Sequence, residues 1–203
     1  MGTKRKKEWF DNEAFWRELY PFMFPEQRFI QTREQVEKVL DTAQQTEVES
    51  ISSLLLPTAI WIPLAARTRN SVIHQMCHMA AEAVLLWDVG KMELAIKSRE
   101  TLHPTALGNG VAMLHPRRPQ DTNIAHAFLA LGITTTGLPF GGPRGVMTDV
   151  FFLIASEREQ GHLQTLARLS RIIAAPEFLD ALRLCESATA AHQLIQETDQ
   201  TLD

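Results

Sequence analysis

Cysteine is scarce in this sequence. Among 203 residues only Cys77 and Cys185 occur, far apart and in neither a CxxC pair nor a metal-ligand spacing. A disulfide framework is therefore excluded, and a reduced, cytoplasmic protein is expected. A strong excess of one charge is also lacking, since the net charge is -4 and the isoelectric point lies near 6.0. This balance gives no general reason to bind nucleic acid.

A long apolar run is missing as well. The most apolar stretch, residues 51–66, is broken by Pro57 and Pro63. It is also shorter than the roughly 20 residues that a membrane-spanning helix requires. The basic N-terminus leads into Glu8 and Asp11, where a secretion signal would place an apolar segment. We therefore expect neither secretion nor membrane insertion.

Motifs that mark several common enzyme classes are absent too. The chain contains no GxxxxGK[ST] loop, no GxSxG elbow and no HExxH pair. A P-loop nucleotide site, a hydrolase nucleophile elbow and a zinc peptidase site are thereby disfavoured. Gly108 and Gly110 form a GxG pair, but the third glycine of a dinucleotide fingerprint does not follow. No cofactor is predicted.

Glycine is unevenly distributed, and its distribution divides the chain. No glycine lies between Gly2 and Gly90, which favours helices over the first ninety residues. Residues 1–45 begin with a basic cluster and continue into an aromatic-rich stretch. They are predicted to form a helical N-terminal extension, and residues 46–203 are predicted to form the main domain.

The main domain mixes two kinds of element. Eight of the ten glycines lie between Gly108 and Gly161 and are interleaved with short apolar runs, a pattern typical of strands. The expected strands are 111–114, 127–131 and 150–155, and the expected helices are 70–86, 92–99, 162–174, one from near Pro176, and 189–198. The predicted buried face of the first helix comprises Val72, Ile73, Met76, Met79, Ala80, Ala83 and Val84. This order predicts an α/β (α+β) fold with a mixed sheet.

Two histidines, His74 and His78, lie four residues apart on the first predicted helix, a spacing that helical metal ligands use. No cluster of cysteine or carboxylate residues completes a site there. The alternative is two ordinary histidines on a polar face, and no metal is predicted. Three further histidines lack an obvious chemical partner in the sequence and are interpreted as ordinary: His103, His126 and His192.

His115 differs from these because of its position. It ends the apolar run 111–114 and is followed at once by Pro116, where a strand should stop. A histidine at that point is held by a rigid scaffold and projects at the margin of the sheet. From the residues alone, a functional histidine and a solvent-facing turn residue both stay open.

The neighbours of His115 suit a phosphoryl group. The glycine-containing turn 105–110 can point backbone N–H groups at an anion. Arg99, Arg117 and Arg118 are close in sequence, and guanidinium groups bind phosphoryl oxygens in bidentate fashion. An imidazole with its ordinary pKa of about 6.5 is largely neutral at pH 7 and can attack phosphorus without a separate base.

The segment from Arg99-Glu100 through this turn and strand to His115 resembles the core signature of enzyme IIA, mannitol/fructose type. Enzyme IIA is a component of the bacterial phosphoenolpyruvate-dependent phosphotransferase system, and its nitrogen-regulatory relatives share the signature. His162-Leu163, which opens a helix after the strand 150–155, is similar to a second block of the family. The resemblance covers roughly residues 50–200 and implies a mixed five-stranded sheet flanked by helices.

The resemblance also implies roles for single residues. His115 would be the phosphoryl acceptor, Arg99 would steady the phosphoryl group, and His162 would lie beside His115 and hydrogen-bond the transferred group. Without the resemblance, His162 would be interpreted as an ordinary residue near the start of a helix. No metal or other cofactor is implied.

The turn before the strand is assigned through the same match. The resemblance implies that it shapes the pocket and supplies the phosphoryl-binding positions Thr105, Gly108, Asn109 and Gly110. One departure lies next to the acceptor, because the family usually has proline directly before the active histidine. Here Leu114 stands at that position and Pro116 follows instead, which puts the local geometry of the loop in question.

The beginning of the chain lies outside this resemblance. Within residues 1–42, the segments 9–16 and 22–29 resemble the opening of some small-molecule methyltransferases of the S-adenosylmethionine class. The glycine-rich cofactor loop that should follow is absent, so no methyl transfer is inferred. Two interpretations stay open: a remnant of a fusion, or a docking arm whose exposed aromatic side chains bind a partner.

The expected function is that of a cytoplasmic phosphocarrier, a histidine phosphotransferase that is charged by an HPr-like carrier. It would pass the phosphoryl group on or signal through its phosphorylation state. One alternative is a sugar-transport enzyme IIA that donates to a separate enzyme IIB. Another is a regulatory binding module of the same fold without turnover. The cysteine pattern of a fused enzyme IIB is missing, which favours a separate or regulatory enzyme IIA.

Overall fold

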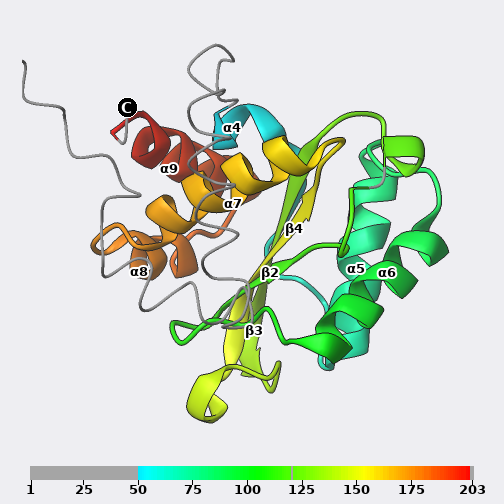
Figure 1. Ribbon diagram of the computed structural model, residues 1–203. Helices are drawn as coiled ribbons and strands as arrows, with labels where there is room; N and C mark the ends of the chain where they lie inside the picture. Colours follow the sequence, from blue (N-terminus) through cyan, green and yellow to red (C-terminus); the bar gives the residue numbers. More distant parts are fainter. Residues whose placement is uncertain (1–49, 120, 202–203) are drawn as a thin grey trace, which may run out of the picture. The chain divides into compact units, whose positions relative to one another are not determined.

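The computed structural model describes residues 50–119 and 121–201 (Figure 1). The chain divides into two units, Met1–Thr46 and Glu47–Asp203, and the described residues belong to the second. The helical extension predicted for residues 1–45, and the methyltransferase-like segment within it, lie outside the described residues. Among those that are described, no helix has the length and apolar character needed to span a bilayer.

A mixed sheet forms the centre of the described unit. Its strands are β1 (Leu55–Trp61), β2 (Val111–Leu114), β3 (Phe128–Leu138) and β4 (Thr148–Ala155). They are arranged in the order β1-β3-β4-β2. β3 and β4 pair antiparallel, whereas β1 pairs parallel with β3 and β2 pairs parallel with β4. The mixed α/β fold class is confirmed, but the described residues form four strands where five were expected.

Helices cover both faces of the sheet (Figure 1). They are α4 (Ile51–Leu54), α5 (Arg69–Glu82), α6 (Val89–Leu102), α7 (Glu159–Ile173), α8 (Phe178–Arg183) and α9 (Ala188–Gln200). Two short 3-10 helices, Asp121–Asn123 and Pro143–Gly145, lie in the loops. The α5–α6 pair covers one face, and α4, α7, α8 and α9 cover the other.

The central strands are apolar on both faces because both faces are covered. Every residue of β2 is buried, and its alternate side chains enter opposite cores. Ala112 and Leu114 pack in the core under α5 and α6. Val111 and Met113 pack in the core under α7, α8 and α9. Uninterrupted apolar runs are typical of strands buried in this way.

The first strand was not predicted. Residues 55–61 belong to an apolar stretch in the region where the sequence favours helices, yet they form β1, which lies at one end of the strand order. Pro57 is compatible with an end strand because a proline there leaves no central ladder bond unmade. The absence of glycine before Gly90 therefore did not exclude a strand.

Most helix boundaries differ by a few residues from those predicted. α5 begins at Arg69, after Thr68, whose side chain forms a capping box with Ser71, so it starts one residue before the expected range 70–86. The same helix ends at Glu82. Val84 therefore lies beyond it, with a φ of 60° and 66% of its surface exposed, and its predicted place on the buried face is wrong.

Candidate functional site

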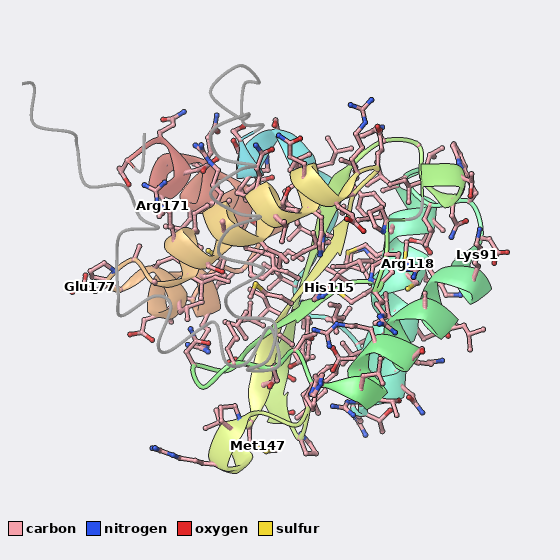
Figure 2. The ribbon with its side chains drawn as sticks, in the orientation of Figure 1. Lys91, His115, Arg118, Met147, Arg171 and Glu177 are labelled. Carbon is pink, nitrogen blue, oxygen red and sulfur yellow. The ribbon has the colours of Figure 1, made fainter. Side chains whose placement is uncertain are left out.

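The site lies at the carboxyl end of β2, next to the first turn of α7 and the last turn of α6. His115 directly follows β2, and His162 lies in the first turn of α7, which follows β4. Because β2 and β4 are parallel, their carboxyl ends lie at the same edge of the sheet. Arg99 comes from the last turn of α6. Figure 2 labels His115 between the layer of α7 and the layer of α5 and α6.

The two imidazoles are in contact. The ring centroids of His115 and His162 are 4.9 Å apart, and the ring planes are inclined by 53°. Both side chains are partly buried. Met113 and Val111 point toward the α7 layer, and the alternation of side chains along a strand directs His115 the same way.

The backbone fixes which nitrogen of His115 carries its proton. Nδ1 lies 2.8 Å from the carbonyl oxygen of Met113. A carbonyl oxygen only accepts hydrogen bonds, so Nδ1 must carry a hydrogen in order to donate to it. In the neutral ring Nε2 then keeps its lone pair. Nε2 is therefore the ring nitrogen of His115 whose lone pair is available to act as a nucleophile.

The surroundings hold both rings in the neutral form. Burial lowers the pKa of His115 to about 3, with His162 and Arg99 adding to the effect and the Met113 carbonyl opposing it. Burial, followed by the charge of Arg99, lowers the pKa of His162 to about 4. At neutral pH neither imidazole carries a charge, although the site contains a permanent cation.

That cation is the guanidinium group of Arg99. It donates a 2.6 Å hydrogen bond to the carbonyl oxygen of His103, which fixes the side chain against the end of its own helix. Burial lowers the pKa of Arg99, Glu100 raises it and Arg117 lowers it, yet an arginine stays charged in a protein. One fixed positive charge beside two neutral imidazoles is an arrangement that attracts an anion.

The turn before β2 does not lie at this site, apart from its first residue. The strand separates Gly110 from His115 by five residues, which is about 16 Å at a rise of about 3.3 Å per residue. The carbonyl of Gly110 accepts hydrogen bonds from the N–H groups of Asp149 and Val150. Asn109 presents its carbonyl to Arg183.

The observed role of this turn is to hold the start of β2. Arg183 forms a two-pronged ion pair with Asp149, at 2.7 and 2.9 Å, beside Gly110. The φ of Gly110 is 83°, and a Cβ atom there would lie 2.7 Å from the Arg183 guanidinium. The structure thus brings His115, His162 and Arg99 together and leaves Gly108, Asn109 and Gly110 at the opposite end of the strand.

Thr105 lies beside the strand, in contact with a buried carboxylate. Its hydroxyl and its backbone N–H both donate to the side chain of Glu100, which is only 2% exposed. A second partner of Glu100 is Arg69, at 3.6 Å. Arg69 also lies over the ring of Phe140 and donates to its carbonyl oxygen.

Sequence reasoning missed two groups at this site. Glu100 was noted only as the neighbour of Arg99 in the signature, although a carboxylate in an otherwise apolar helix face was a usable signal. The carbonyl group of Met113 gave no signal, because a backbone atom is the same at every position. Its importance depends on the ring orientation of His115, which only the structure supplies.

The other histidine pair lies elsewhere on α5. The ring centroids of His74 and His78 are 4.3 Å apart, and His74 Nδ1 lies 2.6 Å from Glu93, which also binds Lys97 at 2.7 Å. Within residues 50–119 and 121–201, no three histidine, cysteine or carboxylate side chains are grouped so that they could hold a metal ion.

Known proteins resemble this chain in both sequence and structure. The sequence profile of the family described as "Phosphoenolpyruvate-dependent sugar phosphotransferase system, EIIA 2" matches residues 53–198. A fructose-specific EIIABC component of Bacillus subtilis is 28% identical over 152 residues, which are 74% of this chain and 24% of that protein. A nitrogen regulatory protein of Bradyrhizobium diazoefficiens is 27% identical over 147 residues, 71% of this chain and 94% of that protein.

Solved structures share the fold. The crystal structure of nitrogen regulatory protein IIA-Ntr from Neisseria meningitidis has a TM-score of 0.64 at 20% sequence identity. The match covers 71% of this chain and 98% of the Neisseria chain. The enzyme IIAMTL in a complex with phosphorylated enzyme IIBMTL from Escherichia coli has a TM-score of 0.61 at 18% sequence identity. This match covers 69% of this chain and 95% of the Escherichia coli chain. At these identities the structural likeness establishes the fold alone.

Proposed function

Because this chain belongs to the phosphotransferase-system EIIA 2 family, whose domains carry phosphoryl groups on histidine, we propose that it is a phosphocarrier with His115 as the acceptor. The contact between His115 and His162 beside Arg99 is the observation that supports this assignment. The donor would be an HPr-like carrier, and the protein would act in the cytoplasm.

The proposed reaction is a direct displacement at phosphorus. The lone pair on Nε2 of His115 forms the new N–P bond while the bond between phosphorus and the donor nitrogen breaks, and the electron pair of that bond returns to the donor. The hydrogen on Nδ1 stays in its bond to the Met113 carbonyl. Such transfers have a loose transition state, so positioning and charge stabilisation provide most of the catalysis.

His162 and Arg99 are proposed to bind the transferred group. The guanidinium of Arg99 would pair with the phosphoryl oxygens, a geometry that its planar fork of donors suits. The neutral ring of His162 would donate one N–H hydrogen bond to the same oxygens, because a neutral imidazole carries one N–H. Both contacts would hold the group in line with Nε2 and stabilise the charge that is spread over its three oxygens in the transition state.

The turn residues are proposed to act at a distance from phosphorus. Gly108, Asn109 and Gly110 lie at the far end of β2, so we assign them to the support of the strand and not to binding of the phosphoryl group. Thr105 is proposed to support the strand from its side, since its hydroxyl is bonded to Glu100.

The decisive experiment is labelling of the full chain with phosphoenolpyruvate, enzyme I and HPr. We expect one acid-labile phosphoryl group per chain, and His115→Ala should abolish the label. His126→Ala is the matched control, because His126 is an exposed histidine outside the site. Undiminished labelling of the His115 variant, or a label mapped to another residue, would contradict the proposal.

A second candidate function concerns the protein that would next receive the phosphoryl group. The related IIAMTL was solved in a complex with phosphorylated enzyme IIBMTL, which supports onward transfer to an enzyme IIB. The nitrogen regulatory relatives support signalling through the phosphorylation state. Loss of label from the phosphorylated chain on addition of an enzyme IIB distinguishes these roles. A regulatory module without turnover would never take up the label.

A further inference from the structure

The short segment 105–107 runs antiparallel to β2 and covers its free edge. Ala106 and Ala112 form an isolated antiparallel bridge, and the N–H of Leu107 donates to the carbonyl of Val111 at 2.7 Å. In the same register, Thr105 is opposite Met113, whose N–H donates to the Thr105 carbonyl at 3.3 Å. Thr105 and Met113 therefore form a hydrogen-bonded pair, in which the N–H of each residue normally donates to the carbonyl group of the other.

Only one of those two bonds is made between the backbones. In a regular ladder the N–H of Thr105 would donate to the carbonyl of Met113. Here that N–H instead lies 3.2 and 3.3 Å from the two carboxylate oxygens of Glu100. The Met113 carbonyl is thus left for a different donor, and the donor that uses it is Nδ1 of His115, at 2.8 Å.

We propose that Glu100 is a positioning residue that draws the Thr105 N–H away from the Met113 carbonyl and so keeps that carbonyl as the acceptor for Nδ1 of His115. The inference rests on the proposed function for its catalytic consequence. Glu100 touches neither ring. It acts through Thr105 and Met113, and its effect is to leave the reactive lone pair on Nε2.

The structure holds Glu100 firmly in this role. Its carboxylate is nearly inaccessible to water and accepts both donors of Thr105. Arg69 lies 3.6 Å away and partly balances the buried charge. A buried carboxylate is costly without such partners, and these partners fix the direction in which the carboxylate faces.

The test compares two glutamates on one helix. Glu100→Met keeps an unbranched side chain of similar length but removes the acceptor, so the Thr105 N–H is released toward the Met113 carbonyl. Glu93→Met makes the same change seven residues earlier on α6, where the partners are His74 and Lys97. Glu100→Gln keeps an oxygen acceptor and serves as the rescue variant.

The first readout is the tautomer of His115, measured by long-range ¹H–¹⁵N correlation on ¹⁵N-histidine-labelled protein. Wild type, Glu93→Met and Glu100→Gln should show the Nδ1–H form. Glu100→Met should show a mixture that includes the Nε2–H form. This readout needs no phosphoryl transfer, so it tests the positioning role even where the proposed function fails.

The second readout is the rate of phosphoryl acceptance from HPr. In Glu100→Met, kcat should fall about tenfold, as expected for a displaced reacting group, while the KM for the carrier stays unchanged. A folded Glu100→Met protein that keeps the Nδ1–H form, or that changes tautomer with kcat unaltered, overturns the proposal. Should that variant not fold, a predominant Nε2–H form in the wild type overturns it equally.

Discussion

The proposed reactivity of His115 depends on two neighbours, Met113 and Arg99, that act in different ways. Met113 sets the tautomer through a hydrogen bond, and burial keeps the ring uncharged. Arg99 adds the charge that a phosphoryl group requires, without protonating either imidazole. A neutral nucleophile beside a fixed cation is suited to accept a dianionic group, because the attraction is already in place before transfer begins.

The geometry of Arg99 should matter beyond its charge. Arg99→Lys keeps a positive charge but loses the planar fork of donors, so we expect kcat for phosphoryl acceptance to fall about tenfold, and Arg99→Ala to lower it about a hundredfold. Rates of label uptake from HPr measure both. Arg144→Lys, in the short helix Pro143–Gly145, is the control and should leave the rate unchanged.

The lowered pKa values of the two histidines predict how stability depends on pH. In the unfolded chain both rings titrate near about 6.5, whereas in the folded protein His115 and His162 titrate near 3 and 4. Below about pH 6.5 the unfolded state therefore binds more protons, and the free energy of unfolding falls as the pH falls. The loss should be of the order of 1 kcal/mol per pH unit for each histidine.

Urea unfolding at pH 7 and pH 5 measures this loss. His115→Gln should lose less stability than the wild type between these two pH values, because one of the two titrating groups is gone. His103→Gln, an exposed change, should lose as much as the wild type. Equal losses in His115→Gln and wild type would show that burial of His115 does not govern its titration.

The bounds of a strand could be predicted best where the signal lies in residues adjacent to one another in the sequence. β2 was predicted with its observed bounds, since an apolar run between a glycine turn and a proline has few alternatives. β3 was predicted as 127–131 but continues to Leu138, because the polar threonines near its end lie at the margin of the core. β1 was missed because Pro57 interrupts its apolar run and the absence of glycine before Gly90 favoured helices, so that only its pairing with β3 identifies it as a strand.

The candidate site was predicted in part for the same reason. His115 could be selected from its position at a strand end and Arg99 as one of three arginines near it in sequence, but His162 depended on the family resemblance, because side chains far apart in the chain give no local signal. The turn residues 108–110 were assigned to the phosphoryl group through the same resemblance. The intervening strand carries it to the other end of the sheet, which only the three-dimensional course of the chain reveals.

The anchoring of β2 at its first residue predicts a stability effect. Gly110→Ala should lower the free energy of unfolding by about 1–3 kcal/mol, because the left-handed backbone is strained by a side chain. The new Cβ would also lie 2.7 Å from Arg183 and 2.9 Å from Asp149.

Gly161→Ala provides the matched comparison. Gly161 lies within α7 with open space around the site of a Cβ, so alanine there should raise stability by about 0.5–1 kcal/mol. Urea unfolding of both variants tests the contrast. Equal effects at the two positions would contradict the interpretation of Gly110 as an anchor.

The described unit as a whole depends on a sheet that is buried between two layers of helices. Phe151 and Phe152 are adjacent in β4 and fully buried, one in the core under α5 and α6 and the other in the core under α7 and α9. Neither layer alone encloses the sheet. The site at the edge of the sheet is therefore assembled from both layers, with Arg99 from one and His162 from the other.

Shortening a buried side chain on either face of β4 should consequently destabilise the same unit. Phe151→Ala and Phe152→Ala should each lower the free energy of unfolding by about 3–5 kcal/mol, as expected when a buried aromatic ring is replaced by a cavity. Urea titration followed by circular dichroism measures the change. Met147→Ala, at a half-exposed side chain, should change stability little. A small effect at only one phenylalanine would mean that its layer packs loosely.

The neutrality of the two imidazoles has a consequence for the proposed cargo. With both rings uncharged, the empty pocket has the positive charge of Arg99, whereas a phosphorylated His115 that keeps its Nδ1 hydrogen combines about two negative charges on the oxygens with one positive charge on the ring. Loading would thus balance the charge of Arg99, whereas a pocket with both rings protonated would stay positive. A docking protein could then distinguish the empty and loaded forms by electrostatic potential, without any change in the backbone.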